Sequence, residues 1–258
     1  GSDTVEKPLR KSIFGIASEH RAFWLIGEPG SGKSTTLQAL SVQRADEILS
    51  TGYLTSPFPI YIQANRFDKT TSFLQIMCEL LKIDLIEMEK YLTTGQCWLL
   101  IDGINEISLS DQEIAFREIQ RLYDVYDETP VLLTSRKYNF YEKMGLPVYE
   151  LLPLTDELIL TFLQKNMKSK NIGRQFFDSL IGSESVLLDF ARNPLMLRML
   201  AQVANDGDLP ENRGQLFRQF MRWIFSRETK LRETSSNPFF VEIVLSKVAF
   251  KMRSNGRT

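Results

Sequence analysis

The chain has 258 residues, which is enough for one large domain or two small ones, each with a buried core. Hydrophobic residues make up 43% of it and charged residues 24%, as is typical of soluble globular proteins. The 31 basic residues nearly cancel the 32 acidic ones. The resulting net charge of −1 excludes a general electrostatic attraction to nucleic acid or to an anionic membrane.

The start of the chain and its cysteines bear on where the protein works. No apolar run approaches the roughly 18 residues that a membrane-spanning helix needs, and the polar N-terminus is not typical of a signal peptide. Cys78 and Cys97 fit neither a disulfide framework nor a spaced zinc site, so we expect two reduced core thiols and a cytoplasmic protein. Because the chain begins with Gly1-Ser2 and stops after an amphipathic run, we expect an excised fragment.

Short apolar segments alternate with helical stretches in the first half of the chain, which predicts an α/β domain with a parallel sheet. The continuous apolar character of these segments is typical of strands that are covered on both faces. We expect five strands, at residues 22–27, 59–64, 97–102, 130–135 and 147–152.

Helices are expected between these strands and throughout the second half. Residues 33–44 and 71–82 carry apolar side chains at helical spacing, and Ser110 begins a capping-box pattern for a further helix. After residue 152 the strand pattern ends and Thr155 is placed to cap a helix. Helical periodicity then recurs, which predicts an α-helical bundle after the sheet domain, at 158–163, 176–190, 195–203 and 216–225.

The segment GEPGSGKST, residues 27–35, matches the phosphate-binding pattern G-x-x-x-x-G-K-[ST] between an expected strand and an expected helix. Its glycines allow a tight backbone turn whose N–H groups surround a phosphate, and the helix points its positive end at the same anion. Lys33 is expected to reach the β- and γ-phosphates, and the Ser34 hydroxyl to ligate Mg²⁺. The nucleotide-binding candidates are Gly27, Pro29, Gly30, Ser31, Gly32, Lys33, Ser34 and Thr35.

A second group of candidate residues, two of them acidic, lies at the ends of two later strands, the first of which is CWLLID. Asp102 ends that strand, at the sheet edge where open α/β sheets bind ligands, and is expected to hold Mg²⁺ through a water molecule. Glu106 is a candidate general base that orients the attacking water. Arg136 follows the next strand and is a candidate contact for the γ-phosphate. The alternatives are a strand-end cap for Asp102, a solvated loop residue for Glu106 and a surface ion pair for Arg136.

Together, these segments resemble the NACHT family of STAND ATPases, which are P-loop NTPases of signalling proteins, some of them bacterial. The resemblance rests on GEPGSGKST, LLIDGINEI and VLLTSR, and downstream on LLPLTDELILTFL, RNPLMLRML and LPENRGQLFRQF. It covers residues 20–228. The absence of an N-K-x-D motif favours ATP or ADP over guanine nucleotides.

The resemblance implies a role for each matched residue. Asp102 is the Walker B aspartate, Glu106 the catalytic acid and Arg136 the sensor, while Pro194 lies near the adenine and helps the helical domain close; the alternative for Pro194 is an ordinary first-turn proline. Family members have a second acidic residue where this chain has Asn105, and an amide cannot take a proton as a carboxylate can.

The resemblance also implies a domain division and partners. We expect an N-terminal segment at 1–20, a nucleotide-binding domain at 21–152, a helical domain at 153–230 and the start of a truncated winged-helix domain at 231–258. The family's effector and sensor domains lie outside this fragment, and self-association belongs to the full-length protein. His20 precedes the first strand and is expected at the surface or beside the adenine, and not as the family's histidine sensor.

The preferred function is a nucleotide-dependent conformational switch with slow Mg²⁺-dependent ATP hydrolysis, which controls oligomerisation in signalling or immune defence. Three alternatives remain: an ordinary multi-turnover ATPase, a kinase, and a non-catalytic interaction module that nucleotide stabilises. The second half of the chain is typical of core-packed bundle helices and not of an arginine-rich lid, which disfavours the kinase.

Overall fold

A computed structural model describes residues 10–51, 57–137, 144–182, 186–206 and 213–232, together with positions 247 and 251. The chain divides into two compact units, Gly1–Leu152 and Pro153–Thr258, each of which is considered by itself. The winged-helix prediction for 231–258 lies outside the described residues, except for the end of one helix and the two single positions.

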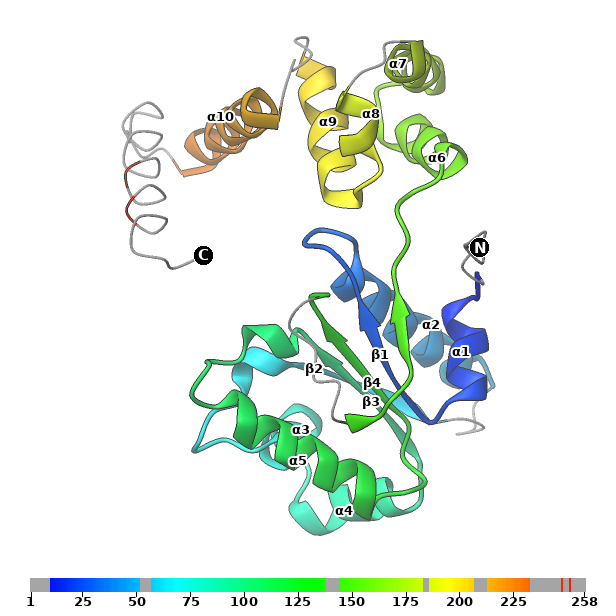
Figure 1. The fold of residues 1–258 in the computed structure, drawn as a ribbon, viewed down its shortest axis with the longest axis vertical. Helices are drawn as coiled ribbons and strands as arrows, with labels where there is room; N and C mark the ends of the chain where they lie inside the picture. The colour runs from blue at the N-terminus through cyan, green and yellow to red at the C-terminus, as the bar shows by residue number, and fades with distance from the viewer. Residues whose placement is uncertain are drawn as a thin grey trace, which may run out of the picture. The chain divides into compact units, whose positions relative to one another are not determined.

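The first unit is built on a five-stranded, all-parallel sheet with the strand order β2-β3-β4-β1-β5 (Figure 1). This confirms the predicted fold class and places every strand within two residues of its expected start. The edge strand β5 is shorter than predicted and is only partly covered by other residues. The strands are β1 (Ala22–Ile26), β2 (Phe58–Gln63), β3 (Cys97–Asp102), β4 (Val131–Ser135) and β5 (Val148–Glu150).

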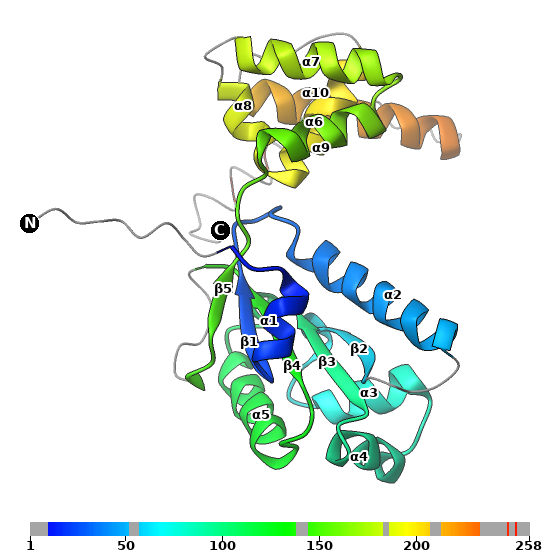
Figure 2. The same ribbon diagram turned by 90° about the vertical axis from the view of Figure 1, so that its right-hand side faces the viewer.

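Helices cover both faces of this sheet (Figure 2), which is why every residue of the central strands is buried and most of them are apolar. Phe23 and Leu25 of β1 point to one face, where α1 (Ile13–Glu19) and α2 (Lys33–Thr51) pack against them. Ala22, Trp24 and Ile26 point to the larger core on the other face. That core is covered by α3 (Phe73–Leu81), α4 (Leu85–Thr93) and α5 (Gln112–Val125).

Two local features differ from the sequence-based expectation. Helix α4 was not predicted; Asp84 caps it by accepting the Glu87 N–H at 2.9 Å. The predicted capping box at Ser110 is wrong, because α5 begins at Gln112 and Asp111 occupies the cap position. The hydroxyl of Ser108 donates to the Asp111 carboxylate at 2.6 Å, and the Asp111 N–H donates to the Ser108 carbonyl at 2.9 Å. This turn delays the start of the helix.

The second unit is helical throughout its described part, as the periodicity predicted. Thr155 caps the first helix, where its hydroxyl accepts the Leu158 N–H at 3.4 Å. The predicted apolar stretch 176–190 is described over 176–182 and 186–190, and these two parts belong to different helices that share an apolar core. The helices are α6 (Asp156–Asn166), α7 (Lys170–Gly182), α8 (Val186–Ala191), α9 (Pro194–Asp206) and α10 (Arg213–Arg232).

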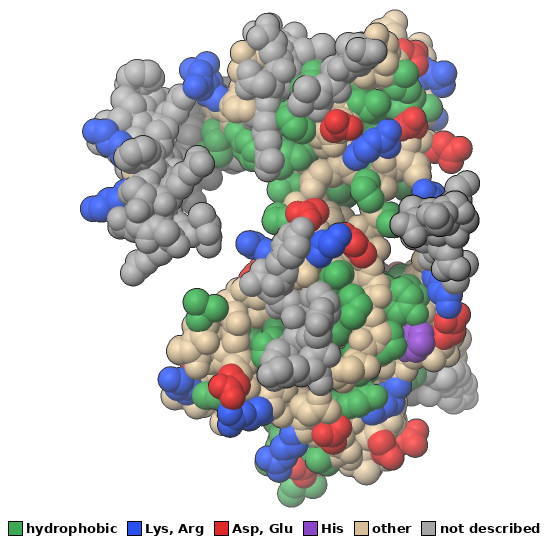
Figure 3. All heavy atoms as spheres, in the orientation of Figure 1, with side chains coloured by type: hydrophobic (Ala, Val, Ile, Leu, Met, Phe, Trp, Pro, Cys, Tyr) green, Lys and Arg blue, Asp and Glu red, His purple; other side chains and the backbone are tan. Residues whose placement is uncertain are grey.

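The charged surface and the two cysteines are consistent with the near-neutral net charge and the low cysteine content of the sequence. Basic and acidic side chains intermingle over the face in Figure 3. Among the described helices, none is long and apolar enough to cross a membrane. Cys78 and Cys97 are free thiols, and burial raises the pKa of Cys97 to about 12.

A close approach of two backbones in the helical unit, at Gly173, gives a test of its packing. A Cβ atom on Gly173 of α7 would lie 2.7 Å from both the carbonyl carbon and the carbonyl oxygen of Leu163 on α6. We therefore expect Gly173→Ala to lower the free energy of unfolding by about 1–3 kcal/mol, the usual cost of overpacking. Urea denaturation followed by circular dichroism measures this change.

Gly182, the last residue of α7, supplies the matched control because a Cβ atom there would meet nothing within 4 Å. Gly182→Ala should leave the free energy of unfolding unchanged or slightly raised, since alanine favours helix. Equal stability of the two variants would contradict the close crossing of α6 and α7.

Candidate functional site

The loop between β1 and α2 has a backbone that depends on its glycines. Gly30 and Gly32 adopt φ angles of 78° and 98°, in the left-handed region that glycine enters without strain. A Cβ atom on Gly27 would lie 2.7 Å from the Ser31 hydroxyl. The loop closes where the N–H of Thr36 donates to the Gly32 carbonyl at 2.8 Å. The three glycines of the motif thus permit a turn that bulkier residues would obstruct.

This loop and the start of α2 gather hydrogen-bond donors. The first amides of the helix, at Lys33, Ser34 and Thr35, have no acceptor within the helix by its geometry. The hydroxyl of Ser31 is buried and has no hydrogen-bond partner among the described residues. The helix dipole adds positive potential at the same point. Amides, a buried hydroxyl and a helix N-terminus together fit a phosphate group.

Lys33 places an ammonium group over the loop. Its Nζ donates to the carbonyl oxygens of Gly27 at 2.8 Å and of Glu28 at 3.0 Å, which leaves a third donor of the ammonium for another acceptor. Burial lowers the pKa of Lys33 below its ordinary value, while the Asp102 carboxylate acts in the opposite direction and Arg136 reinforces the decrease. The predicted cation and the predicted metal-binding carboxylate therefore lie within electrostatic range of each other.

The Asp102 carboxylate is held from both neighbouring strands. Asp102 ends β3 and is 9% exposed. Its Oδ1 accepts from the Thr134 hydroxyl of β4 at 2.6 Å, and its Oδ2 accepts from the Tyr61 hydroxyl of β2 at 2.8 Å. Thr134 also accepts the Gly103 N–H at 2.8 Å. Both oxygens of this buried anion are thereby satisfied, which lowers the cost of removing it from water.

Sequence reasoning missed Tyr61 and gave Thr134 no role. The sequence does show a hydroxyl-bearing residue inside the apolar strand PIYIQA. Its role becomes clear only from the sheet order, which places β2 beside β3. Burial, together with the hydrogen bond to Asp102, raises the pKa of Tyr61 to about 12. The phenol is therefore a donor to the carboxylate at neutral pH.

Glu106 sits on a tight turn that follows Asp102. Gly103 has a φ angle of 76°, and the Glu106 N–H donates to its carbonyl at 2.7 Å. A Cβ atom on Gly103 would lie 3.0 Å from the Glu106 carboxyl carbon, so the glycine leaves room for that side chain to fold back. Glu106 is exposed to solvent and acts electrostatically on Lys33. It is placed to contact water beside the charged cluster.

Asn105 links this turn to the end of β4. Its side-chain oxygen accepts the backbone N–H of Arg136 at 3.0 Å. Arg136 is exposed, directly after β4, and its charge influences Lys33. The structure therefore brings together the predicted residues Lys33, Asp102, Glu106 and Arg136 at the carboxyl edge of the sheet.

The donor set suits a magnesium ion that arrives with a nucleotide. Among the described residues no group of three or more metal-ligating side chains occurs. Asp102 offers a single carboxylate, and the Ser34 hydroxyl is exposed at the start of α2. Mg²⁺ commonly combines one or two carboxylates with phosphate oxygens and water, so these residues fit that mode and not a site made by protein ligands alone.

Two further candidate residues, Pro194 and His20, belong to other elements of the chain. Pro194 begins α9 in the second unit, after Asn193, whose side-chain oxygen accepts the Leu195 N–H at 3.0 Å. That is the ordinary place of a first-turn proline. His20 forms a 2.7 Å hydrogen bond between its Nε2 and the Tyr149 hydroxyl of β5.

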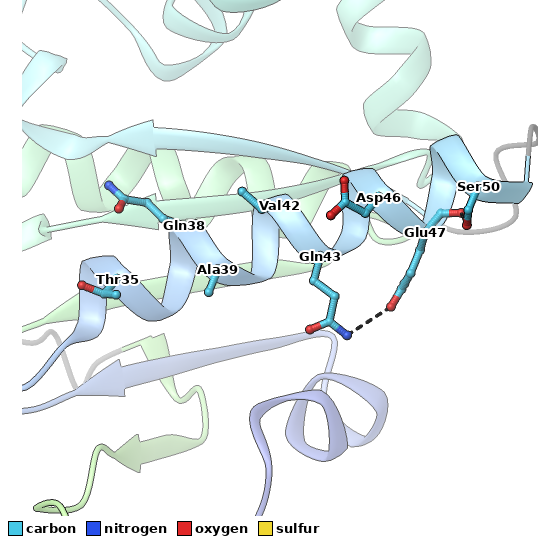
Figure 4. Close-up of a pocket in the computed structure, with 8 residues that line it drawn as sticks. All are labelled: Thr35, Gln38, Ala39, Val42, Gln43, Asp46, Glu47 and Ser50. Carbon is cyan, nitrogen blue, oxygen red and sulfur yellow. Dashed lines mark hydrogen bonds between the residues drawn. The ribbon is translucent and has the colours of Figure 1, made fainter. Parts of the chain in front are cut away.

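A shallow groove follows the outer side of α2 (Figure 4). Its described lining comes from that one helix, starts at Thr35 and runs toward Ser50. Apart from Thr35, it includes none of the residues predicted to bind nucleotide. The candidate site is therefore defined by the loop backbone and its charges, and not by this groove.

Comparisons with known proteins identify the family. The NACHT domain model matches residues 21–170, which is more than half of the chain. The fold is similar to a Caenorhabditis elegans PCH-2 structure, with 12% identity, a TM-score of 0.41, and coverage of 81% of this chain and 62% of that one. A Signal Transduction ATPase with Numerous Domains (STAND) protein with a tetratricopeptide repeat sensor, from Pyrococcus horikoshii, gives 13% identity, a TM-score of 0.48, and coverage of 84% and 33%.

This chain thus spans less than two thirds of the length of either solved chain. No curated protein matches it by sequence. The family match begins just before β1 and includes the phosphate loop, Asp102, Glu106 and Arg136. This chain therefore belongs to the NACHT domain family and is a nucleotide-binding P-loop NTPase module.

Proposed function

We propose that this NACHT module is a nucleotide-dependent conformational switch that binds ATP or ADP with Mg²⁺ and hydrolyses ATP slowly. In the full-length protein, the switch controls self-association in signalling or immune defence. The observation that carries the proposal is the meeting of Lys33, Asp102, Glu106 and Arg136 beside a loop that offers the buried Ser31 hydroxyl and the first amides of α2. Such a cluster recognises a polyphosphate and its metal together.

Each part of the loop has a distinct task in this proposal. The backbone from Gly27 to Gly32, with Pro29 and Ser31, encloses the phosphates, and the first amides of α2 extend the cradle to Thr35. Lys33 neutralises the β- and γ-phosphates, while Ser34 and Asp102 hold Mg²⁺, the latter through water. The metal, when bound, supplies charge neutralisation at the phosphates.

Slow hydrolysis follows from the proton acceptors available. Glu106 is the proposed base that orients water, and Arg136 contacts the γ-phosphate. Asn105 cannot accept a proton, and its oxygen already accepts the Arg136 N–H. One carboxylate therefore carries the work of activating water, which supports a module that retains its nucleotide for long periods.

A switch also requires that the nucleotide bias the arrangement of two parts of the chain. A ligand shifts a conformational equilibrium only by its difference in affinity for the two states. The second unit supplies Pro194 as the proposed contact to the adenine, and the first unit supplies Arg136 at the phosphates. Contacts to both units would give ADP and ATP different effects on their arrangement.

Nucleotide binding is tested with Lys33→Ala. For the wild-type chain we expect Mg-ADP to raise stability by about 2.7 kcal/mol at a free concentration of 100 times the dissociation constant. Lys33→Ala should lose most of this gain, because it removes the ammonium from the phosphate loop. Lys90→Ala, a lysine on α4, is the matched control and should keep it. Isothermal titration calorimetry measures the heat of Mg-ADP binding, and thermal unfolding measures the gain in stability. A wild-type chain that gives neither binding heat nor a shift in unfolding temperature would overturn the proposal.

Hydrolysis is tested with Glu106→Gln, which keeps the size of the side chain and removes its basicity. We expect the single-turnover rate of ATP hydrolysis to fall by about 10²-fold, at the low end for loss of a general base, while ADP affinity is retained. Glu113→Gln, an exposed substitution on α5, should hydrolyse ATP like wild type. Equal rates in all three proteins would exclude Glu106 as the base, and rapid multiple turnover by wild type would favour an ordinary ATPase.

Switching is tested on the full-length protein. We expect its mass in solution, measured by light scattering in the presence of the activator, to be larger with a slowly hydrolysed ATP analogue than with ADP. Lys33→Ala should give the same mass with both ligands. A wild-type protein whose mass is the same under every combination of nucleotide and activator would favour a non-catalytic module that nucleotide only stabilises.

A further inference from the structure

Tyr61 connects three elements at the carboxyl edge of the sheet. It lies on β2, and its hydroxyl donates to the Asp102 Oδ2 on β3 at 2.8 Å. The same hydroxyl is 3.5 Å from the side-chain nitrogen of Gln38 on α2, which donates to it. Figure 4 shows Gln38 near the end of α2 at which Thr35 lies. Tyr61 therefore joins the carboxylate to the helix that begins at the phosphate loop.

Two hydroxyls fix the plane of the Asp102 carboxylate. Thr134 of β4 is fully buried, and its hydroxyl donates to Oδ1 at 2.6 Å. Tyr61 donates to Oδ2 from β2, the strand on the other side of β3. A carboxylate held at one oxygen only can still turn about its Cβ–Cγ bond, whereas anchors at both oxygens restrict that rotation. Tyr61 thus supplies an orientational restraint that Thr134 alone does not provide.

The restraint leaves the carboxylate able to act on a metal. An ionised carboxylate has about four lone-pair positions on its two oxygens, and the two hydroxyls occupy one on each. One position on each oxygen stays available for a metal-bound water. Groups that orient a metal ligand from outside the coordination sphere strongly affect metal affinity.

We propose that Tyr61 is a positioning residue, which holds the Asp102 carboxylate in the orientation that binds Mg²⁺ and so sets the magnesium affinity of the nucleotide complex. This inference rests on the proposed function, since it assigns Asp102 to the metal of a bound nucleotide. It gives β2, a strand outside the recognised motifs, a part in the site.

The test is Tyr61→Phe, which keeps the ring and removes the hydroxyl. Binding of a fluorescent ADP analogue is measured over a series of Mg²⁺ concentrations and in excess EDTA. We expect that the Mg²⁺ concentration needed for half of the full gain in affinity for the ADP analogue, the half-effect concentration, rises by about tenfold. This is the lower end of the range for loss of a group that orients a metal ligand. Affinity in EDTA should stay at the wild-type value, because the phosphate loop is unaltered. The unfolding temperature of the nucleotide-free protein should fall slightly, because Asp102 loses one of its two hydrogen bonds to hydroxyl groups.

Tyr91→Phe is the matched control. The Tyr91 hydroxyl also donates to a carboxylate, that of Glu87 at 3.1 Å, but within α4 and away from Asp102. This variant should have the magnesium dependence of wild type. An unchanged or lower half-effect concentration for Tyr61→Phe would overturn the inference. A loss of ADP affinity in EDTA as large as the loss in Mg²⁺ would also overturn it, by assigning Tyr61 a purely structural role.

The outcomes separate this inference from the function on which it rests. If wild type does not bind the ADP analogue at any Mg²⁺ concentration, the proposed nucleotide switch fails. If wild type binds it in a Mg²⁺-dependent manner and Tyr61→Phe behaves in the same way, only the role of Tyr61 fails.

Discussion

The constraint on which this site depends is a carboxylate held almost without solvent at the end of a central strand. Asp102 is 9% exposed, and a charge so placed is tolerated only when it is hydrogen-bonded and faces a compensating charge. Tyr61 and Thr134 supply the hydrogen bonds from the strands on either side, and Lys33 supplies the charge. The anion therefore ties β2, β3, β4 and the phosphate loop together, and a change in any of them alters its surroundings.

The strand order turns this constraint into a binding site. β4 lies between β1 and β3, so the phosphate loop that leaves β1 and the carboxylate that ends β3 are two strand spacings apart, roughly 9–10 Å. That gap has room for phosphate oxygens and a hydrated metal, while adjacent strands would have brought Lys33 and Asp102 into direct contact. The intervening strand carries Thr134, which holds the carboxylate, and is followed by the exposed Arg136. The proposed nucleotide site thus draws on each of the three strands.

Much of this arrangement could be predicted from the sequence, because its signals are local. Covered strands are runs of mostly apolar residues, and the phosphate loop needs glycines at fixed spacing, so the sheet and the loop can be recognised in the sequence itself. The role of Tyr61 could not be predicted from the sequence, because it depends on which strand lies beside β3. Helix α4 is short, and in place of the Ser110 capping pattern the structure has a turn in which the Ser108 hydroxyl donates to the Asp111 carboxylate and the Asp111 N–H donates to the Ser108 carbonyl. Hydrogen bonds within a turn and the order of strands in the sheet cannot be predicted from the sequence pattern alone.

Asn105 shows how an amide can serve a site where a carboxylate would otherwise add basicity. Its oxygen holds the Arg136 N–H, and it directly precedes Glu106 on the same tight turn. The proposed base and the proposed sensor are therefore joined through the Asn105 side chain, which lies next to Glu106 in the sequence and accepts the Arg136 N–H. An amide forms this link without taking up a proton, so the link does not change with pH as that of a carboxylate would. In the proposed function, an amide at position 105 would favour slow hydrolysis and would also keep Glu106 and Arg136 linked, which suits a module whose output is the state of its nucleotide more than its rate of turnover.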